Sequence, residues 1–382
     1  MQHRDTIFRF CRGPFLTTAA AVVAFSGLAF PPLAPNQLPP VEKSWKQVCE
    51  RALSAPLKLP SFPRVQPDSW LRNCDSEALY YGFTASPNYP EAMQCAYYQR
   101  AHPEPSSGNP FYGPGVLMML YANGKGVPRN YDLAIRFACE NTWAADAEME
   151  YRIGRLEHLR DTHAITTHFD LCDDGTSGLT EGACALVQES LADAKRTRQI
   201  REISATWPTK VTAAFPSLQK AENAFVKARV ENEVDLSGTG RVAFQLEEEG
   251  VLRDQFLINL KRFAEVDVPA ATDRDSEQLE KTLDLLLGQI QSSSGSAWQF
   301  TTVTPNGIGT TQRAWLSLLQ AWTDFGRVAY PRLDTNRIRA QIIRLRIHQL
   351  RSLVKDHVDS RKSSTSHLAS PSISLDSPLS IW

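Results

Sequence analysis

The chain has 382 residues, of which 42% are hydrophobic, and its 41 Lys and Arg residues nearly balance its 42 Asp and Glu residues. This length allows two domains with hydrophobic cores of their own. The balanced charge argues against a nucleic-acid-binding protein, and no run of basic residues is interleaved with aromatic residues.

The first 29 residues have the features of an export signal. Arg4, Arg9 and Arg12 give a basic start, and residues 15–30 are mostly apolar. Small residues before and at Ala29 suit a cleavage site. We therefore expect a periplasmic or secreted protein with no integral membrane span after cleavage. An uncleaved N-terminal anchor is the alternative.

Cysteine usage agrees with export, because six cysteines remain once residues 1–29 are removed. An even number outside the cytosol predicts three disulfides, although six cysteines can pair in many ways. The working assignment joins Cys49 to Cys74, Cys95 to Cys139, and Cys172 to Cys184. A zinc site is disfavoured because no Cys-x-x-Cys occurs.

Residues 30–67 are proline-rich and predict a linker with one short helix over residues 41–53. Residues 68–165 follow, with helices expected near 78–81, 90–100, 116–122, 132–142 and 144–159. An Asn-Tyr-x-x-Ala phrase starts at Asn88 and returns 42 residues later at Asn130. A repeat of this length is typical of stacked helical hairpins, which build binding surfaces.

The second copy carries a family resemblance. Residues 120–134 read Leu-Tyr-Ala-Asn-Gly-Lys-Gly-Val-Pro-Arg-Asn-Tyr-Asp-Leu-Ala, which resembles the Sel-one-like repeat, a relative of the tetratricopeptide repeat. The matching positions are Gly124, Gly126, Val127, Asp132 and Ala134. The first copy lacks the Gly-x-Gly-Val turn. The resemblance implies helical hairpins and a binding role.

Residues 166–356 show helical apolar stripes almost throughout. We expect a turn between Pro208 and Pro216, a break at residues 237–240, a loop at 292–296 and an extended stretch at 298–305. The fold class predicted for the chain is all-α: a short helical-hairpin repeat domain followed by an antiparallel helical bundle. Residues 357–382 are Ser-rich and predict a disordered tail.

The bundle region contains a second resemblance. Gln312, Arg313, Ala314, Trp315 and Leu316 are similar to the last conserved element of the lysozyme-inhibitor LprI-like domain. The family's following Arg falls here at Leu319, so that charge is missing. The resemblance implies an exported helical protein that blocks a lysozyme or another cell-wall hydrolase sterically.

Residues that could support chemistry or metal binding are not arranged for it. Three histidines are five apart, which does not suit ligands on one helix face. The aspartates of residues 170–174 lack the alternating Asp-x-Asp-x-Asp spacing of a calcium-binding loop. The glutamates at 231, 233 and 247–249 are interpreted as solvated charges or as a docking surface for a basic partner. The three histidines are His158, His163 and His168.

We therefore expect a non-enzymatic protein without cofactor or metal. Its partner is predicted to be a protein, either a lysozyme-like hydrolase or an envelope protein, and not a nucleic acid. The alternative hypotheses are a repeat-based scaffold that holds a peptide or envelope protein, and an enzyme that acts on peptidoglycan, for which no catalytic grouping is recognisable.

Overall fold

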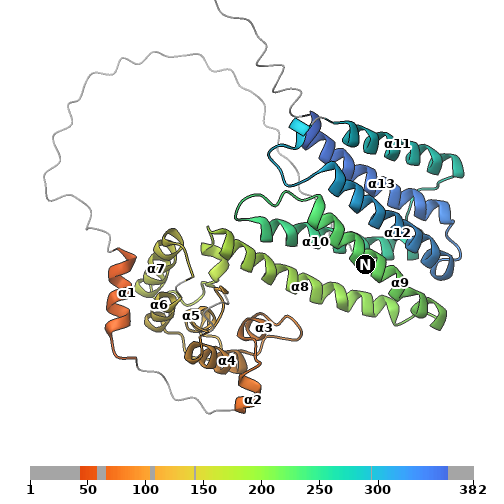
Figure 1. The fold of residues 1–382 in the computed structure, drawn as a ribbon. Helices are drawn as coiled ribbons and strands as arrows, with labels where there is room; N and C mark the ends of the chain where they lie inside the picture. The colour runs from red at the N-terminus through yellow and green to blue at the C-terminus, as the bar shows by residue number, and fades with distance from the viewer. Residues whose placement is uncertain (1–43, 58–65, 104–107, 142, 294, 360–382) are drawn as a thin grey trace, which may run out of the picture. The chain divides into compact units, whose positions relative to one another are not determined.

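The computed structural model describes residues 44–57, 66–103, 108–141, 143–293 and 295–359 (Figure 1). The predicted signal at 1–29 and most of the predicted tail lie outside these ranges. Within them the chain forms thirteen α-helices and no strand, so the all-α prediction is confirmed. No helix in the described ranges combines the length and the apolar character that crossing a bilayer demands.

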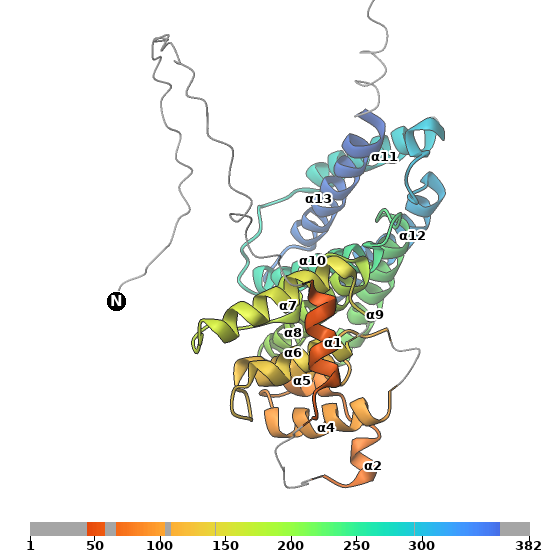
Figure 2. The same cartoon turned by 90° about the vertical axis from the view of Figure 1, so that its left-hand side faces the viewer.

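The first part of the chain consists of short helices. They are α1 (Trp45–Ser54), α2 (Asp68–Leu71), α3 (Ser76–Tyr81), α4 (Tyr89–Ala101), α5 (Pro114–Asn123), α6 (Tyr131–Glu140) and α7 (Asp146–Asp161). Helices α3 and α4 form one hairpin, α5 and α6 form the next, and α4 packs against α5. Helix α1 packs against α6 and α7, far along the chain (Figure 2).

The two hairpins repeat their capping contacts 42 residues apart. Gly82 ends α3 with φ 78°, and Gly124 ends α5 with φ 65°, a left-handed conformation that glycine adopts without a steric cost. The side chain of Asn88 caps α4, and that of Asn130 caps α6 in the same way. The repeated Asn-Tyr-x-x-Ala phrase is therefore the start of the second helix of each hairpin.

A hydrophobic core surrounds α5, whose residues 115–122 are all buried. Ala92 and Ala134, the alanines of the two repeated phrases, are completely buried beside it. Val187 of the following long helix belongs to the same core, and Leu191 packs against it. The hairpin core therefore extends beyond residue 165.

All six remaining cysteines form disulfides, but two of the three expected pairings are wrong. Cys49 pairs with Cys139, and Cys74 pairs with Cys95. The reason is that α1 packs across α6, which brings Cys49 to the end of the second hairpin, while Cys74 precedes α3 and lies beside α4. The expected pairing of Cys172 with Cys184 is confirmed.

The second part consists of long helices. They are α8 (Gly178–Ser204), α9 (Thr209–Asn232), α10 (Arg241–Ala264), α11 (Asp273–Ser292), α12 (Pro305–Ala329) and α13 (Thr335–Leu353). Helix α9 packs on α12, α8 on α10, and α11 on α13. Their shared core contains a cluster of aromatic rings that includes Trp207, Phe215, Phe256, Trp322 and Phe325.

Three local predictions are wrong in this part. Pro216 lies inside α9, where buried Phe215 and Leu218 hold the helix against the core on both sides of it. Residues 298–305 are not one extended stretch, because Trp298 ends a 3-10 turn, residues 299–302 form turns and bends, and Pro305 begins α12. The first three residues of the predicted tail, 357–359, belong to a π-helical turn that continues α13 to Asp359. The break at 237–240 is confirmed.

Candidate functional site

The described part of the chain contains a groove of about 1160 Å³. One wall is the loop of residues 82–86, which follows the α3 C-cap. The other walls come from α8, α9 and α10. Gly82 is required at the start of this loop, because a Cβ there would lie 2.5 Å from the carbonyl oxygen of Ala85.

Close packing of α8 on α10 builds the floor of the groove. A Cβ on Gly250 would lie 2.7 Å from a carboxylate oxygen of Glu189, so a larger residue there would displace this flexible side chain. The buried Arg196 of α8 is bonded to Glu189 and donates to Asp254 of α10 at 3.1 Å. This arginine joins the two helices by charge-assisted hydrogen bonds.

The rim of the groove carries charges of both signs. Arg253 donates to Glu249 at 2.6 Å and to the side chain of Asn223 at 3.2 Å. Arg198 and Arg201 are exposed on α8 and line the same hollow. The rim of the groove therefore carries both positive and negative groups.

A second hollow of about 300 Å³ between α9 and α10 continues the groove. The two hollows share Asn223, Leu246, Glu249 and Arg253. Sites for small molecules are usually closed, mostly apolar and between about 300 and 1,000 Å³. The combined groove is longer, open and charged, which suits a segment of a macromolecule better.

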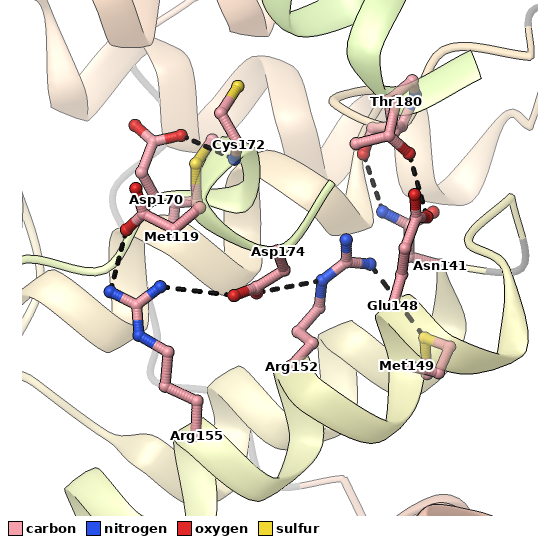
Figure 3. A network of polar contacts seen from close by, with 12 residues as sticks. Met119, Asn141, Glu148, Met149, Arg152, Arg155, Asp170, Cys172, Asp174 and Thr180 are labelled. Carbon is pink, nitrogen blue, oxygen red and sulfur yellow. Dashed lines mark hydrogen bonds and ion pairs between the residues drawn. The ribbon is translucent and has the colours of Figure 1, made fainter. Parts of the chain in front are cut away.

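A buried polar network fixes the start of α8 (Figure 3). Glu148 of α7 accepts hydrogen bonds from the backbone N–H groups of Thr176 (2.8 Å) and Ser177 (2.6 Å) and from the hydroxyl of Thr180 (2.9 Å). Burial alone would raise the pKa of Glu148, but these hydrogen bonds hold it below its usual value. An anion at this position stabilises the N-terminal turn of α8.

Two arginines of α7 complete this network. Arg152 lies 3.5 Å from Asp174, and both side chains are fully buried. Arg155 contacts Asp174 at 3.3 Å and Asp173 at 2.8 Å. Burial raises the pKa of Asp174 to about 6, although the arginines oppose this shift. The network acts as a structural junction.

The aspartates of residues 170–174 do not converge on a cation site. Asp170 accepts hydrogen bonds from the hydroxyl of Tyr81 at 3.0 Å and from the backbone of Cys172 at 2.9 Å, while Asp174 faces Arg152. The three histidines of the sequence analysis are exposed. In the described ranges no group of three or more His, Cys, Asp or Glu residues is arranged to hold a metal ion.

The residues of the LprI-like motif divide between the inside and the outside of α12. Gln312 is buried and accepts a hydrogen bond from Nε of Arg346 at 3.0 Å. Trp315 is in the core, and Ala314 is partly buried. Arg313 and Leu316 are exposed. Sequence reasoning did not connect Gln312 with Arg346, because 34 residues separate them.

The acidic stretch of the sequence analysis is largely neutralised. Glu233 is fully buried, and its two carboxylate oxygens accept hydrogen bonds from Arg346 at 2.6 and 2.8 Å. Arg229 joins Glu233 to Glu248. The expectation that these glutamates are solvated is therefore wrong for Glu233 and Glu248, and the free acidic face is smaller than the sequence suggests.

The residues of the Sel-one-like motif support the hairpin stack. Val127 is buried, and Ala134 lies in the core. Gly126 has φ 71°, and a Cβ there would lie 2.9 Å from the Cβ of Tyr89. This glycine therefore lets the turn of the second hairpin contact the first residue of α4.

The groove residues themselves were missed by sequence reasoning. Glu189, Asp193 and Arg201 read as ordinary charges on an exposed helix face, and residues 82–86 carry no motif. The groove forms where these α8 residues meet α9, α10 and the loop of residues 82–86, which are distant from one another in the sequence. Comparison with known proteins finds no matching family model, no matching curated protein and no matching solved structure.

Proposed function

We propose that this chain is an exported, non-enzymatic binding protein of the cell envelope that holds a segment of a partner protein in the groove of α8, α9 and α10. The observation that supports the proposal is the groove itself, which is long, open and lined by charges of both signs. Three disulfides fit an oxidising compartment outside the cytosol.

The partner proposed first is a lysozyme-like cell-wall hydrolase, which the protein would inhibit by steric block. This choice rests on the resemblance of residues 312–316 to the LprI-like domain. No bond is made or broken by this chain in such a mechanism. Gln312 and Trp315 have structural roles inside the bundle, and we place the contact with the partner in the groove.

The test measures lysozyme activity and complex formation with the full chain and a double variant, Arg198→Glu with Arg201→Glu. Both arginines are exposed on the groove rim, so we expect the variant to fold. Reversing two charges at an interface disturbs its electrostatic complementarity, so we expect the variant to bind the hydrolase at least about tenfold more weakly. The matched control is Arg274→Glu with Lys281→Glu on α11, which makes the same change in charge away from the groove.

Equal binding by the wild type and the double variant would remove the groove from the proposal. Absence of both inhibition and a complex with the wild-type chain would remove hydrolase inhibition altogether.

A second candidate function is a scaffold that uses the hairpin repeats. It is favoured by two aromatic residues that lie exposed near α7, Trp143 (41% exposed) and Tyr151 (60% exposed). Deleting the hairpins would not test it, because Val187 of α8 would lose its core. The double variant Trp143→Ser with Tyr151→Ser keeps that core. Loss of a captured envelope protein in this variant, but not in the groove variant, would favour the scaffold.

A further inference from the structure

A small cavity of about 30 Å³ lies among α9, α10, α12 and α13, apart from the groove. Four aromatic side chains line it: Phe225, Phe256, Trp315 and Trp322. The rings of Phe256 and Trp322 are 5.2 Å apart between centroids. An aromatic ring attracts a positive charge through its face, so a cation is stabilised where it lies over one of these rings.

Two polar acceptors line the same cavity without a donor. Glu222 of α9 is only 6% exposed and makes no hydrogen bond or ion pair with any residue of the described ranges. The Oε1 atom of Gln349 of α13 is buried, and it has no hydrogen-bond partner there either. A buried acceptor without a donor is unfavourable, and more so when it is charged.

The charged groups around Glu222 leave its carboxyl group uncompensated. Arg346 also lines the cavity, but its guanidinium binds both oxygens of Glu233. The charge of Arg253 on α10 lowers the pKa of Glu222 somewhat, but its guanidinium donates hydrogen bonds to Glu249 and Asn223 and not to Glu222. Helix α12 contributes no charged residue to the cavity wall. Each arginine therefore already forms an ion pair with another glutamate, and Glu222 forms none in the described ranges.

We propose that this cavity is a binding site for a small ammonium ion, either ammonium itself or methylammonium. Its N–H groups would donate to the carboxylate of Glu222 and to Oε1 of Gln349, while the aromatic rings surround the charge. A cavity needs roughly 10–15 Å³ of such volume to hold one water molecule, so about 30 Å³ suits a ligand of one or two non-hydrogen atoms.

Binding of the cation is coupled to the protonation of Glu222. Burial raises the pKa of this carboxyl group to about 8, so the site holds a proton at neutral pH. An ammonium ion that binds below pH 8 displaces this proton to solvent, and the ion binds more tightly as the pH rises toward 8. The cavity shares no lining residue with the groove, so ammonium binding can be tested apart from the proposed function.

The test uses the full chain at pH 8.5 with ammonium chloride and methylammonium chloride. Sodium chloride and tetramethylammonium chloride at the same ionic strength are the comparisons. We expect a saturable rise in thermal midpoint with the first two salts only. In Glu222→Gln, half-saturation should require at least about tenfold more ligand, because a charge-assisted hydrogen bond is lost.

The matched control is Glu231→Gln, which removes an exposed carboxylate from the same helix and should bind like the wild type. In the wild-type protein, cross-relaxation in NMR spectra between the methyl group of methylammonium and the ring protons of Trp315 or Trp322 gives a second measurement that needs no variant. An unchanged response in Glu222→Gln, or equal responses to sodium and methylammonium, would overturn the proposal. A cavity that holds water alone, with no response to either ion, would also overturn it.

Discussion

Replacement of Arg346 by Met should destabilise the bundle strongly. Arg346 and Glu233 are both fully buried, and two hydrogen bonds of 2.6 and 2.8 Å join them. The Met side chain keeps much of the volume but leaves Glu233 with only Arg229 as a partner. Loss of one member of a buried pair typically costs about 3–5 kcal/mol, since the remaining charge stays buried.

The double variant Arg346→Met with Glu233→Leu gives the decisive comparison. Removing both charges also removes the desolvation cost, so this variant should be more stable than Arg346→Met alone. We expect a coupling of at least about 2 kcal/mol between the two positions. Arg229 retains Glu248 as its partner in this variant.

Urea unfolding followed by tryptophan fluorescence measures these differences, because Trp315 and Trp322 lie in the same core. The control is Arg327→Met, which breaks an exposed pair with Asp324 at 2.7 Å and should cost less than about 1 kcal/mol. A loss of stability in Arg346→Met no larger than in this control would contradict the prediction. So would losses for Arg346→Met and Glu233→Leu that simply add in the double variant.

Two further predictions concern pH and the disulfides. Glu222 has its pKa raised from 4.5 to about 8 in the folded chain, so its contribution to stability is fully present below pH 4.5 and is lost as the pH rises through 8. Between pH 4.5 and pH 8 the free energy of unfolding of the wild type should therefore fall, relative to Glu222→Gln, by up to about 1.4 kcal/mol per pH unit. Urea midpoints of the two proteins that change in parallel from pH 4 to pH 8.5 would contradict this. Removal of the Cys49–Cys139 disulfide, whose sequence separation is 90, should cost about 4–5 kcal/mol, against about 3 kcal/mol for Cys172–Cys184, whose separation is 12. Thermal unfolding of the two double-serine variants checks the order, and a reversed order would show that loop length does not decide the cost.

The sequence was sufficient where the determinants of structure are local. Asn88 and Asn130 cap helices through contacts within four residues, and Gly124 ends a helix through its own φ angle. These signals set the boundaries of the hairpins. The apolar residues spaced three and four apart along the long helices likewise predicted the bundle, because burial follows the helical period.

The sequence was insufficient where a feature depends on which helices pack together. Glu233 and Arg346 are 113 residues apart, so nothing in their surroundings indicates that they are a buried pair. The wrong cysteine pairings have the same origin, since Cys49 is brought to Cys139 by the packing of α1 on α6. Pro216 is a different case: a local signal predicted a turn, and core packing on both sides overrode it.

The connectivity of the two hairpin disulfides bears on the order in which they form. The Cys74–Cys95 link lies wholly inside the span closed by Cys49 and Cys139. Because synthesis starts at the N-terminus, Cys74 becomes available to Cys49 long before Cys139 does. Oxidation in order of emergence would therefore trap a non-native bond, so maturation requires either delayed oxidation of Cys49 or the help of a thiol–disulfide isomerase.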